Sequence, residues 1–250
     1  MTVSGGIAYS LSGASPGTGN NSAVVALDAN GNSGCSGTPK VCTPLWQYPL
    51  TNPVNSPTDY VSVQGTTLYA GTWALMGTLR NPDIVGSVEA FDAKGVSGCA
   101  GTPVMCSPLW TSPNTFPPLG SPLVGDGFAF SHAFVGPFAA FDANGKTNCS
   151  GNPVVCNPVW TSSIGNGTGG QVIPFAIGGS VIYVGDSPNL YAFDASGSAG
   201  CAASVCSPLW STNRPNGSVD FSNVIVANGM VYASTNDSSG NGEVFAYGLP

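Results

Sequence analysis

One sequence pattern occurs four times in this chain of 250 residues. Each copy runs from an apolar stretch through Asp-Ala-x-Gly to two cysteines, and it ends in Pro-(Leu/Val)-Trp. The tryptophans that end the copies are Trp46, Trp110, Trp160 and Trp210, which makes the spacings 64, 50 and 50 residues. Periods of this size are typical of arrays of similar supersecondary units, each of which buries its apolar face only against a neighbour.

A second pattern lies upstream of each copy and predicts further strands. Short apolar stretches that end in an aromatic residue, each preceded by a glycine-bearing turn, occur five times, at residues 6–9, 67–69, 127–130, 181–183 and 230–232. Another strand is expected before the turn in four cases, at residues 60–63, 121–124, 172–177 and 223–226. The stretch that ends in Ala-(Leu/Phe)-Asp, or in Phe245-Ala246-Tyr247 in the last unit, supplies a third strand, and Pro-(Leu/Val)-Trp supplies the fourth. Four short strands joined by tight turns are typical of one blade of a β-propeller.

We therefore predict an all-β fold, a β-propeller of about five four-stranded blades that forms a single domain over residues 1–250. The repeat units are expected at roughly 1–50, 51–114, 115–164, 165–214 and 215–250. The composition agrees, because 35 glycines and 21 prolines leave little room for helices of any length. The sequence also shows no apolar spacing typical of an amphipathic helix.

The charge balance argues against two classes of partner. Only 7% of the residues are charged, and five Lys plus Arg stand against twelve Asp plus Glu, so the chain has no basic stripe for nucleic acid or an anionic membrane surface. The longest apolar runs are strand-sized, so we expect no membrane span. Met1 is followed by Thr-Val-Ser-Gly-Gly, which has no features of an export signal, so we expect that a signal was removed or that this is a segment of a longer chain.

All eight cysteines occupy the same place in the repeat, two in each copy. This regular local pairing predicts four disulfides, Cys35–Cys42, Cys99–Cys106, Cys149–Cys156 and Cys201–Cys206. Metal binding and free thiols are the alternatives. Zinc requires four ligands in a tetrahedral arrangement, but each cysteine pair belongs to a different unit, and His132 is the only histidine in the sequence. Disulfides imply an oxidising compartment, so we expect a protein that is secreted, at the cell surface or in the periplasm.

The repeated aspartates have a structural and a functional interpretation. They are Asp28, Asp92, Asp142 and Asp194, each at the end of a predicted third strand. A carboxylate there can accept hydrogen bonds from the amides of the following turn. Calcium binding is the alternative, since residues 28–32 carry oxygen side chains at alternate positions, but Lys94 replaces the asparagine in the second copy and no bidentate glutamate follows.

The repeat contains the glycine turn, the Val-Tyr strand, and the sequence Tyr-Ala-Phe-Asp-Ala followed by a glycine and a tryptophan. In these features the chain resembles the pyrroloquinoline-quinone-like (PQQ-like) propeller repeat over residues 6–247. Quinoprotein dehydrogenases and a propeller lipoprotein of outer-membrane assembly share that repeat. The resemblance implies a propeller, but the chain departs from the family in the cysteine loop that separates Gly31 from Trp46. It also has no adjacent cysteines, and Glu89 and Glu243 are its only glutamates, so we expect no quinone cofactor and no enzyme activity.

We predict no catalytic residue, and the best candidate for recognition is an insertion in the second unit. It covers roughly residues 72–85 and contains Trp73, Met76, Arg80 and Asp83. A long loop on a rigid scaffold suits recognition, although a tolerated surface insertion explains it equally well.

The two end units appear incomplete in the sequence. The first has only Thr2 and Val3 as candidates for its first strand, and the last ends without the aspartate, cysteines and tryptophan. Open sheet edges invite pairing with other chains. We therefore expect either a segment of a longer propeller or subunits that form a homo-oligomer or fibre. The predicted function is a non-catalytic extracellular structural or binding scaffold for protein or glycan partners; the alternative is a carbohydrate-active or quinoprotein-like enzyme.

Overall fold

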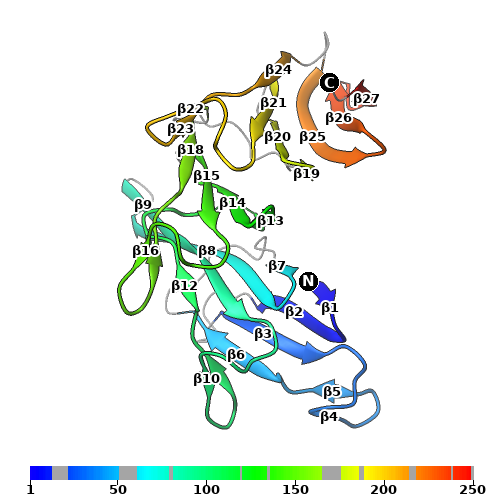
Figure 1. Ribbon diagram of the computed structural model, residues 1–250. Helices are drawn as coiled ribbons and strands as arrows, with labels where there is room; N and C mark the ends of the chain where they lie inside the picture. The colour runs from blue at the N-terminus through cyan, green and yellow to red at the C-terminus, as the bar shows by residue number, and fades with distance from the viewer. Residues whose placement is uncertain are drawn as a thin grey trace.

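The fold is built from strands alone in the part of the chain that the structure describes. The computed structural model describes residues 1–12, 22–50, 61–78, 81–118, 120–133, 136–164, 176–185, 189–213, 218–237 and 239–248. Every regular element in these ranges is a β-strand (Figure 1). This confirms the predicted all-β class, and none of the described segments forms a helix that is long and apolar enough to cross a membrane.

Five antiparallel meanders follow one another along the described part of the chain. The first consists of β1 (Thr2–Ser4), β2 (Ile7–Ser12), β3 (Ala23–Asp28) and β6 (Trp46–Pro49), and the second of β7 (Val61–Gln64), β8 (Thr67–Thr78), β9 (Asn81–Asp92) and β12 (Trp110–Thr111). The third consists of β13 (Leu123–Gly125), β14 (Phe128–His132), β15 (Phe138–Asp142) and β18 (Trp160–Ser162), and the fourth of β19 (Ala176–Gly178), β20 (Val181–Gly185), β21 (Asn189–Asp194) and β24 (Trp210–Asn213). The fifth has three described strands, β25 (Ser218–Ala227), β26 (Met230–Asp237) and β27 (Gly242–Gly248).

One expectation about an individual strand needs correction, and another falls partly outside the described residues. The first unit is complete, because β1 pairs in register with β2, from Thr2 opposite Tyr9 to Ser4 opposite Ile7. The first strand of the fourth unit begins at Ala176, and the earlier part of the predicted stretch 172–177 lies outside the described residues. Only the fifth unit therefore has fewer than four strands in the described part of the chain.

The four predicted disulfides are confirmed, and each one closes a small two-stranded hairpin. The hairpins are β4 (Cys35–Ser36) with β5 (Val41–Cys42), β10 (Cys99–Ala100) with β11 (Met105–Cys106), β16 (Cys149–Ser150) with β17 (Val155–Cys156), and β22 (Cys201–Ala202) with β23 (Val205–Cys206). In each hairpin the two cysteines are direct cross-strand partners. The bridge thus fixes a register that a hairpin this short holds poorly on its own.

Each hairpin after the first belongs to the sheet of the preceding unit. β11 pairs in parallel with β6 of the first sheet, β17 with β12 of the second and β23 with β18 of the third. Three of the sheets therefore have six strands, whereas β4 and β5 form a separate two-stranded sheet. The sequence did not predict this exchange between neighbouring units.

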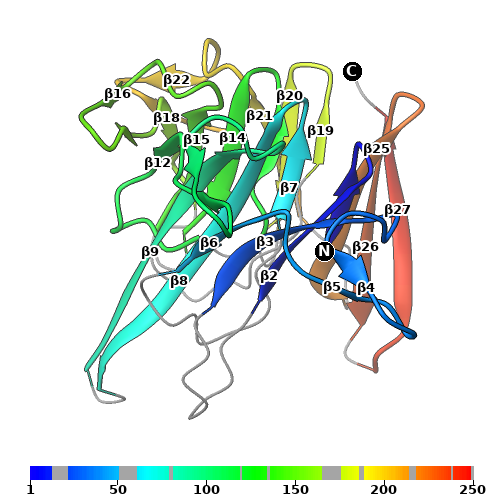
Figure 2. The ribbon, with the colours of Figure 1, turned by 90° about the horizontal axis from the view of Figure 1, so that it is seen from below.

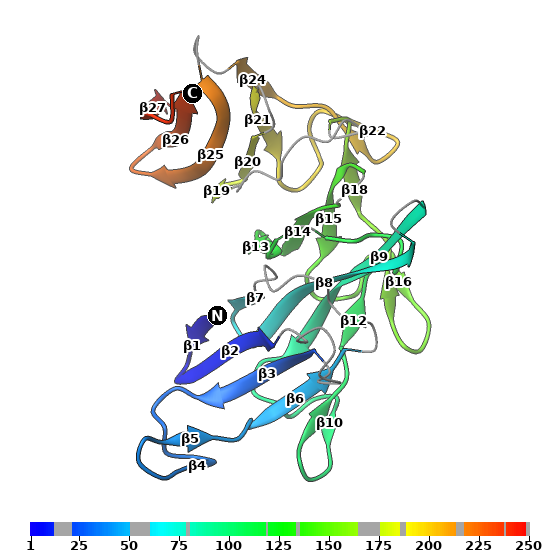
Figure 3. The same ribbon diagram turned by 180° about the vertical axis from the view of Figure 1, so that it is seen from behind.

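The five sheets form an arc with their first strands along its inner side (Figures 1 and 3). β7 contacts β1 and β13, β13 contacts β19, and β19 contacts β25, in chain order. The hairpins lie on the opposite, outer side of the arc (Figure 3). A closed ring is not detected among the described residues, and the structure establishes a radial series of sheets.

The apolar core lies between neighbouring sheets rather than inside any one of them. Trp46 of the first unit packs with Leu68 and Phe91 of the second, and all three are almost fully buried. Equivalent clusters join the second unit to the third, the third to the fourth, and the fourth to the fifth. The repeated aromatic residues pack here because strand alternation directs one face of each sheet toward the next.

Candidate interaction surface

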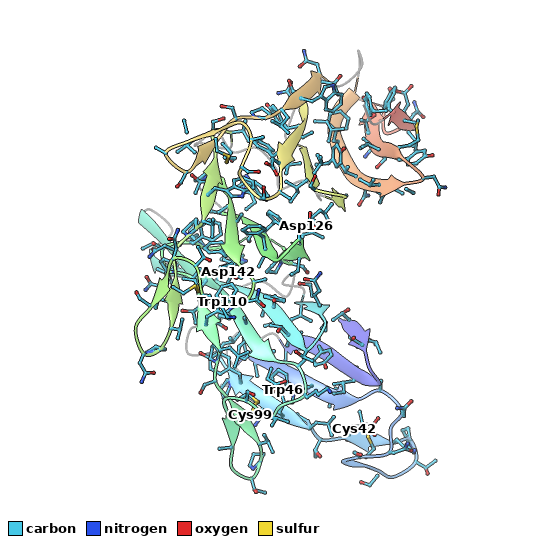
Figure 4. All side chains as sticks on the ribbon, viewed as in Figure 1. Cys42, Trp46, Cys99, Trp110, Asp126 and Asp142 are labelled. Atoms are coloured by element: carbon cyan, nitrogen blue, oxygen red, sulfur yellow. A yellow bond between two sulfur atoms is a disulfide. The ribbon has the colours of Figure 1, made fainter. Side chains whose placement is uncertain are left out.

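In the first three units, the tryptophan at the end of the unit packs on the Asp-Ala-x-Gly turn of the next unit. The indole N–H groups of Trp46, Trp110 and Trp160 donate to the carbonyl oxygens of Ala93, Ala143 and Ala195, each at 3.1 Å. These three side chains are at most 2% exposed. Trp110 and Asp142, from neighbouring units, lie close together in Figure 4. We call this arrangement the tryptophan junction.

The turn glycine is necessary for the junction on two grounds. Gly197 has a φ angle of +70°, which residues other than glycine rarely adopt. A Cβ atom at this position would lie 2.4 Å from Cδ1 of Trp160. Gly95 and Gly145 are placed in the same way against Trp46 and Trp110. The glycine of the repeated pattern therefore sets both the shape of the turn and the approach of the indole ring.

The repeated aspartates hold the turns together, as the structural interpretation predicted. In the third unit Oδ1 of Asp142 accepts from the amide of Asn144 at 2.8 Å, and Oδ2 accepts from the amide of Thr147 at 2.7 Å. Burial acts to raise the pKa of Asp142, but these hydrogen bonds outweigh it, and the pKa lies below its ordinary value. Asp28, Asp92 and Asp194 bind their turns in the same way, and each has a lowered pKa.

These hydrogen bonds bear on the calcium alternative. The carboxylate oxygens that a cation would need point at backbone amides of their own turn. In the described part of the chain no group of three or more histidine, cysteine, aspartate or glutamate side chains is placed to hold a metal ion. The turns thus have a structural role that requires no ion.

The hairpins complete the three junctions with backbone hydrogen bonds. Gln47, which follows Trp46 in β6, donates its amide to the carbonyl of Val104 in the next unit at 3.0 Å. Thr111 and Thr161, the residues after Trp110 and Trp160, donate to the carbonyls of Val154 and Ser204 at 3.0 and 2.9 Å. Each junction therefore combines a buried indole, a turn and a parallel strand, and all three come from the same two neighbouring units.

The end of the fourth unit lacks these partners in the described structure. Trp210 is 40% exposed and the preceding Leu209 is 52% exposed. No hairpin adds to β24 among the described strands, and no described carbonyl accepts a hydrogen bond from the Trp210 indole. Instead, its ring meets Tyr247 edge-on, with centroids 5.6 Å apart. We call the outer edge of β24 together with Leu209 and Trp210 the open edge.

A cavity lies beside the open edge, between the fourth and fifth sheets. Its volume is about 470 Å³, and Leu209, Trp210, Tyr247, Val181 and Val231 are among the residues that line it. The register of β26 with β27 aligns Gly248 with Asp194 of the fourth unit, so a glycine stands here where the repeated pattern has its aspartate. The turn that would cover Trp210 therefore lacks the carboxylate of the other turns.

The hairpin of the first unit, β4–β5, unlike the other three hairpins, does not pair with a larger sheet in the described structure. Val41 is 71% exposed, and Cys42 is only partly buried, whereas Cys106, Cys156 and Cys206 are at most 3% exposed. The outward placement of Cys42 is visible in Figure 4.

The predicted recognition loop is in fact an extension of two strands, which corrects the expectation of a loop. β8 and β9 pair continuously from Thr67 opposite Asp92 to Thr78 opposite Asn81, and this long hairpin projects beyond the neighbouring strands (Figure 2). Met76 and Asp83 face each other across it in the backbone register, and Trp73 pairs with Gly86. Arg80 lies outside the described residues. The structure thus places three of the four residues on one hairpin, and Trp73 lines a cavity discussed below.

Comparison with known proteins informs the fold alone. No protein-family model matches the chain, and no curated protein sequence matches it. The crystal structure of the computationally designed Ika4 protein matches 84% of this chain and 100% of its own, with a TM-score of 0.51 and 8% identity. The designed Ika8 protein (96% of this chain, 71% of its own, 10% identity) and apo AztD from Citrobacter koseri (91%, 68%, 13%) have TM-scores of 0.45 and 0.33. The likeness to Ika4 supports an all-β fold of several sheets.

Proposed function

We propose that this chain is a non-catalytic structural or binding scaffold, a five-bladed propeller of PQQ-like repeats that assembles with another polypeptide at the open edge. Four disulfides are typical of proteins in oxidising compartments, which supports a location outside the cell or in the periplasm. Protein partners, and glycans at the cell surface, fit the low charge of the chain.

The observation that carries the proposal is the contrast at the open edge. Three tryptophans of the repeat are buried under a turn and a hairpin of the next unit, whereas Trp210 is 40% exposed in β24, whose outer edge has no neighbour among the described strands. An exposed strand edge with large apolar side chains is a common site of β-augmentation, in which a strand from another chain supplies the missing backbone hydrogen bonds.

The internal junctions indicate what the partner should contain. A segment with the pattern Asp-Ala-x-Gly, a cysteine hairpin and Pro-(Leu/Val)-Trp would place a turn on Trp210 and a hairpin along β24. Its final strand would add to β27, where the fifth sheet ends among the described strands. One continuous segment in another chain would thus satisfy the open edge and complete the fifth sheet. We infer that the partner carries this pattern.

A peptide that copies residues 142–162, with the Cys149–Cys156 disulfide formed, tests the proposal directly. Within this chain that segment covers Trp110 and β12, so it should bind the equivalent groups, Trp210 and β24, in trans. We expect saturable binding in calorimetry and a blue shift of tryptophan fluorescence. Trp210→Ala in the protein should weaken binding by about tenfold or more, which corresponds to roughly 1.4 kcal/mol or more.

Two peptide variants separate specific docking from adhesion. Gly145→Val should abolish binding, because a Cβ at this position lies 2.5 Å from Cδ1 of Trp110 in the internal junction. Ser150→Val adds similar apolar area at an exposed position of β16 and should leave binding unchanged. Equal binding of both variants, or binding that ignores Trp210→Ala, would contradict the proposal.

The size of the chain in solution is the second test. Light scattering coupled to size exclusion should show assemblies of the chain with a partner that bears the pattern, and Ser211→Pro should prevent them. Ser211 follows Trp210, so its amide is equivalent to the amides of Gln47, Thr111 and Thr161 that bind the hairpins. Ser211→Ala keeps this amide and serves as the control. Assembly that survives Ser211→Pro would place the interface elsewhere and overturn the role of β24.

A further inference from the structure

A second cavity lies between the first two sheets, at the outer end of their contact. Its volume is about 480 Å³. β6 contributes Tyr48, the β8–β9 hairpin contributes Trp73 and Glu89, and the segment after β12 contributes Ser112 and Asn114. None of the assembly groups at the open edge lines this cavity, so it is a separate feature of the molecule.

Glu89 is the unusual side chain of this cavity. It is 7% exposed, its Oε1 accepts from the hydroxyl of Ser87 at 3.3 Å, and its Oε2 has no hydrogen-bond partner among the described residues. No lysine, arginine or histidine is among the described residues that line the cavity. A buried carboxylate without a cation is costly, and burial raises the pKa of Glu89 to about 7.

The repeat shows that nothing in the fold requires a carboxyl group at this position. Glu89 pairs with Thr111, the residue after the tryptophan of its unit. The same pairing places Val25, Ala139 and Tyr191 at the equivalent positions of the other three complete units. The second unit has therefore replaced an uncharged residue by an acid, at the cost of burying an unsatisfied oxygen.

The second unit also differs by its long hairpin, and both differences meet in one place. The extension of β8 and β9 supplies Trp73, opposite Gly86 and three residues along β9 from Glu89. Tyr48 approaches from the first sheet. Burial raises the pKa of its hydroxyl, and the negative charge of Glu89 adds to this increase, so the two side chains lie within electrostatic reach. Two aromatic side chains thus border the same cavity as the acid.

Three hydroxyl groups of the wall already donate hydrogen bonds within the protein. Ser87 donates to Glu89, Thr72 donates to the carbonyl of Ser87 at 3.4 Å, and Ser112 donates to the carbonyl of Pro113 at 3.3 Å. Oε2 of Glu89 has no such partner in the described part of the chain. When Glu89 is ionised, a ligand that satisfies this oxygen must donate a hydrogen bond, and a cationic donor would also balance the charge of the carboxylate.

We propose that this cavity binds an organic cation, a primary ammonium group on an apolar or aromatic stem. The ammonium group donates to Oε2 of Glu89, and the stem packs against Tyr48 and Trp73, whose ring faces favour cations. The chain's net charge of −7 favours the approach of such a ligand over that of an anion. This site is independent of the assembly proposed above.

Calorimetry with a matched pair of small molecules tests the inference. 2-Phenylethylamine, which is cationic at pH 7, should bind saturably to the intact chain, and its neutral analogue 2-phenylethanol should bind about tenfold or more weakly. Titrations in two buffers with different ionisation enthalpies should show release of about half a proton per amine at pH 7, because the bound ammonium ionises a carboxyl group whose pKa is about 7.

Two isosteric variants give the controls. Glu89→Gln should remove both the preference for the amine and the proton release, while thermal unfolding confirms that the variant is folded. Glu243→Gln alters the other glutamate of the chain, which is exposed on β27, and should leave binding unchanged. Equal affinities for amine and alcohol, no binding of either, or amine binding that persists in Glu89→Gln would overturn the inference. None of these results depends on whether the chain assembles at the open edge.

Discussion

Two junctions of the molecule contain related residues but differ in how well they bury them. One joins the third and fourth units, and the other joins the fourth and fifth. Trp160 stacks on Phe193 and is buried under the turn of residues 194–197, whereas Trp210 meets Tyr247 edge-on and stays 40% exposed. The two tryptophans occupy the same position of the repeat, so the indole alone does not make a junction. Burial of the tryptophan also requires the turn and the hairpin of the following unit. Matched substitutions at the two junctions should therefore change the free energy of unfolding by different amounts.

The largest difference is expected when the tryptophans themselves are removed. Trp110→Ala should lower the free energy of unfolding by about 4 kcal/mol, because it leaves a large cavity at a side chain that is 2% exposed. Trp210→Ala should cost about 1 kcal/mol, since much of its surface already meets solvent. Urea unfolding followed by circular dichroism measures both values. Equal losses would mean that the exposed tryptophan is as well packed as the buried one.

The turn glycines separate backbone strain from ring packing. Gly197→Ala and Gly31→Ala both place a side chain at positive φ, at +70° and +66°. At Gly197 the new Cβ also meets Trp160 at 2.4 Å, whereas at Gly31 the nearest atom is Cδ of Lys40 at 3.5 Å. We expect losses of about 3 and about 1 kcal/mol, respectively, in urea unfolding. A loss at Gly31 as large as that at Gly197 would assign the whole effect to the backbone.

The disulfides offer a third comparison, between a hairpin that lies on a sheet and one that does not. Replacing either pair by serines should cost roughly 2 kcal/mol of loop entropy. The Cys149/Cys156 double variant should lose more than the Cys35/Cys42 variant, because Cys156 is fully buried and Cys42 is not. Thermal unfolding of the two double variants provides the measurement. The reverse order would show that β4–β5 is held as firmly as the other hairpins.

The smallest difference is expected at the turn aspartates, and it depends on pH. Asp142→Asn should cost about 1 kcal/mol at pH 7, because it weakens the turn that covers Trp110, and Asp28→Asn should cost less. Both carboxyl groups have a pKa below the ordinary value of 3.8, so their stabilisation is present above that pH. It is lost as the pH falls through the lower folded value. The free energies of unfolding of the two variants should differ at pH 7 and should become equal in acid.

The repeated pattern predicted the parts of the fold that depend on local sequence. The third strands, the pairing of the eight cysteines and the hydrogen bonds of Asp28, Asp92, Asp142 and Asp194 all lie within about twenty residues of one another in each copy, and all were confirmed. The parallel pairing of Met105 with Gln47 was missed, because it joins residues 58 positions apart and no local signal marks the partner of a hairpin edge.

The candidate sites show the same limit. The extra residues near Trp73 were visible in the sequence, but their alternating pattern was too weak to distinguish two long strands from a loop. Glu89 stood out only as one of two glutamates, and its burial became clear once the pairing aligned it with Val25, Ala139 and Tyr191. A comparison of equivalent positions across the copies is the signal that would have identified it.

Each described hairpin that joins a sheet joins the sheet immediately before its own, and this has a consequence for how such a chain can change length during evolution. Among the described strands, each of these pairings joins units that are adjacent in the sequence. Duplication or deletion of one whole copy would therefore recreate the same kind of pairing at the new boundary.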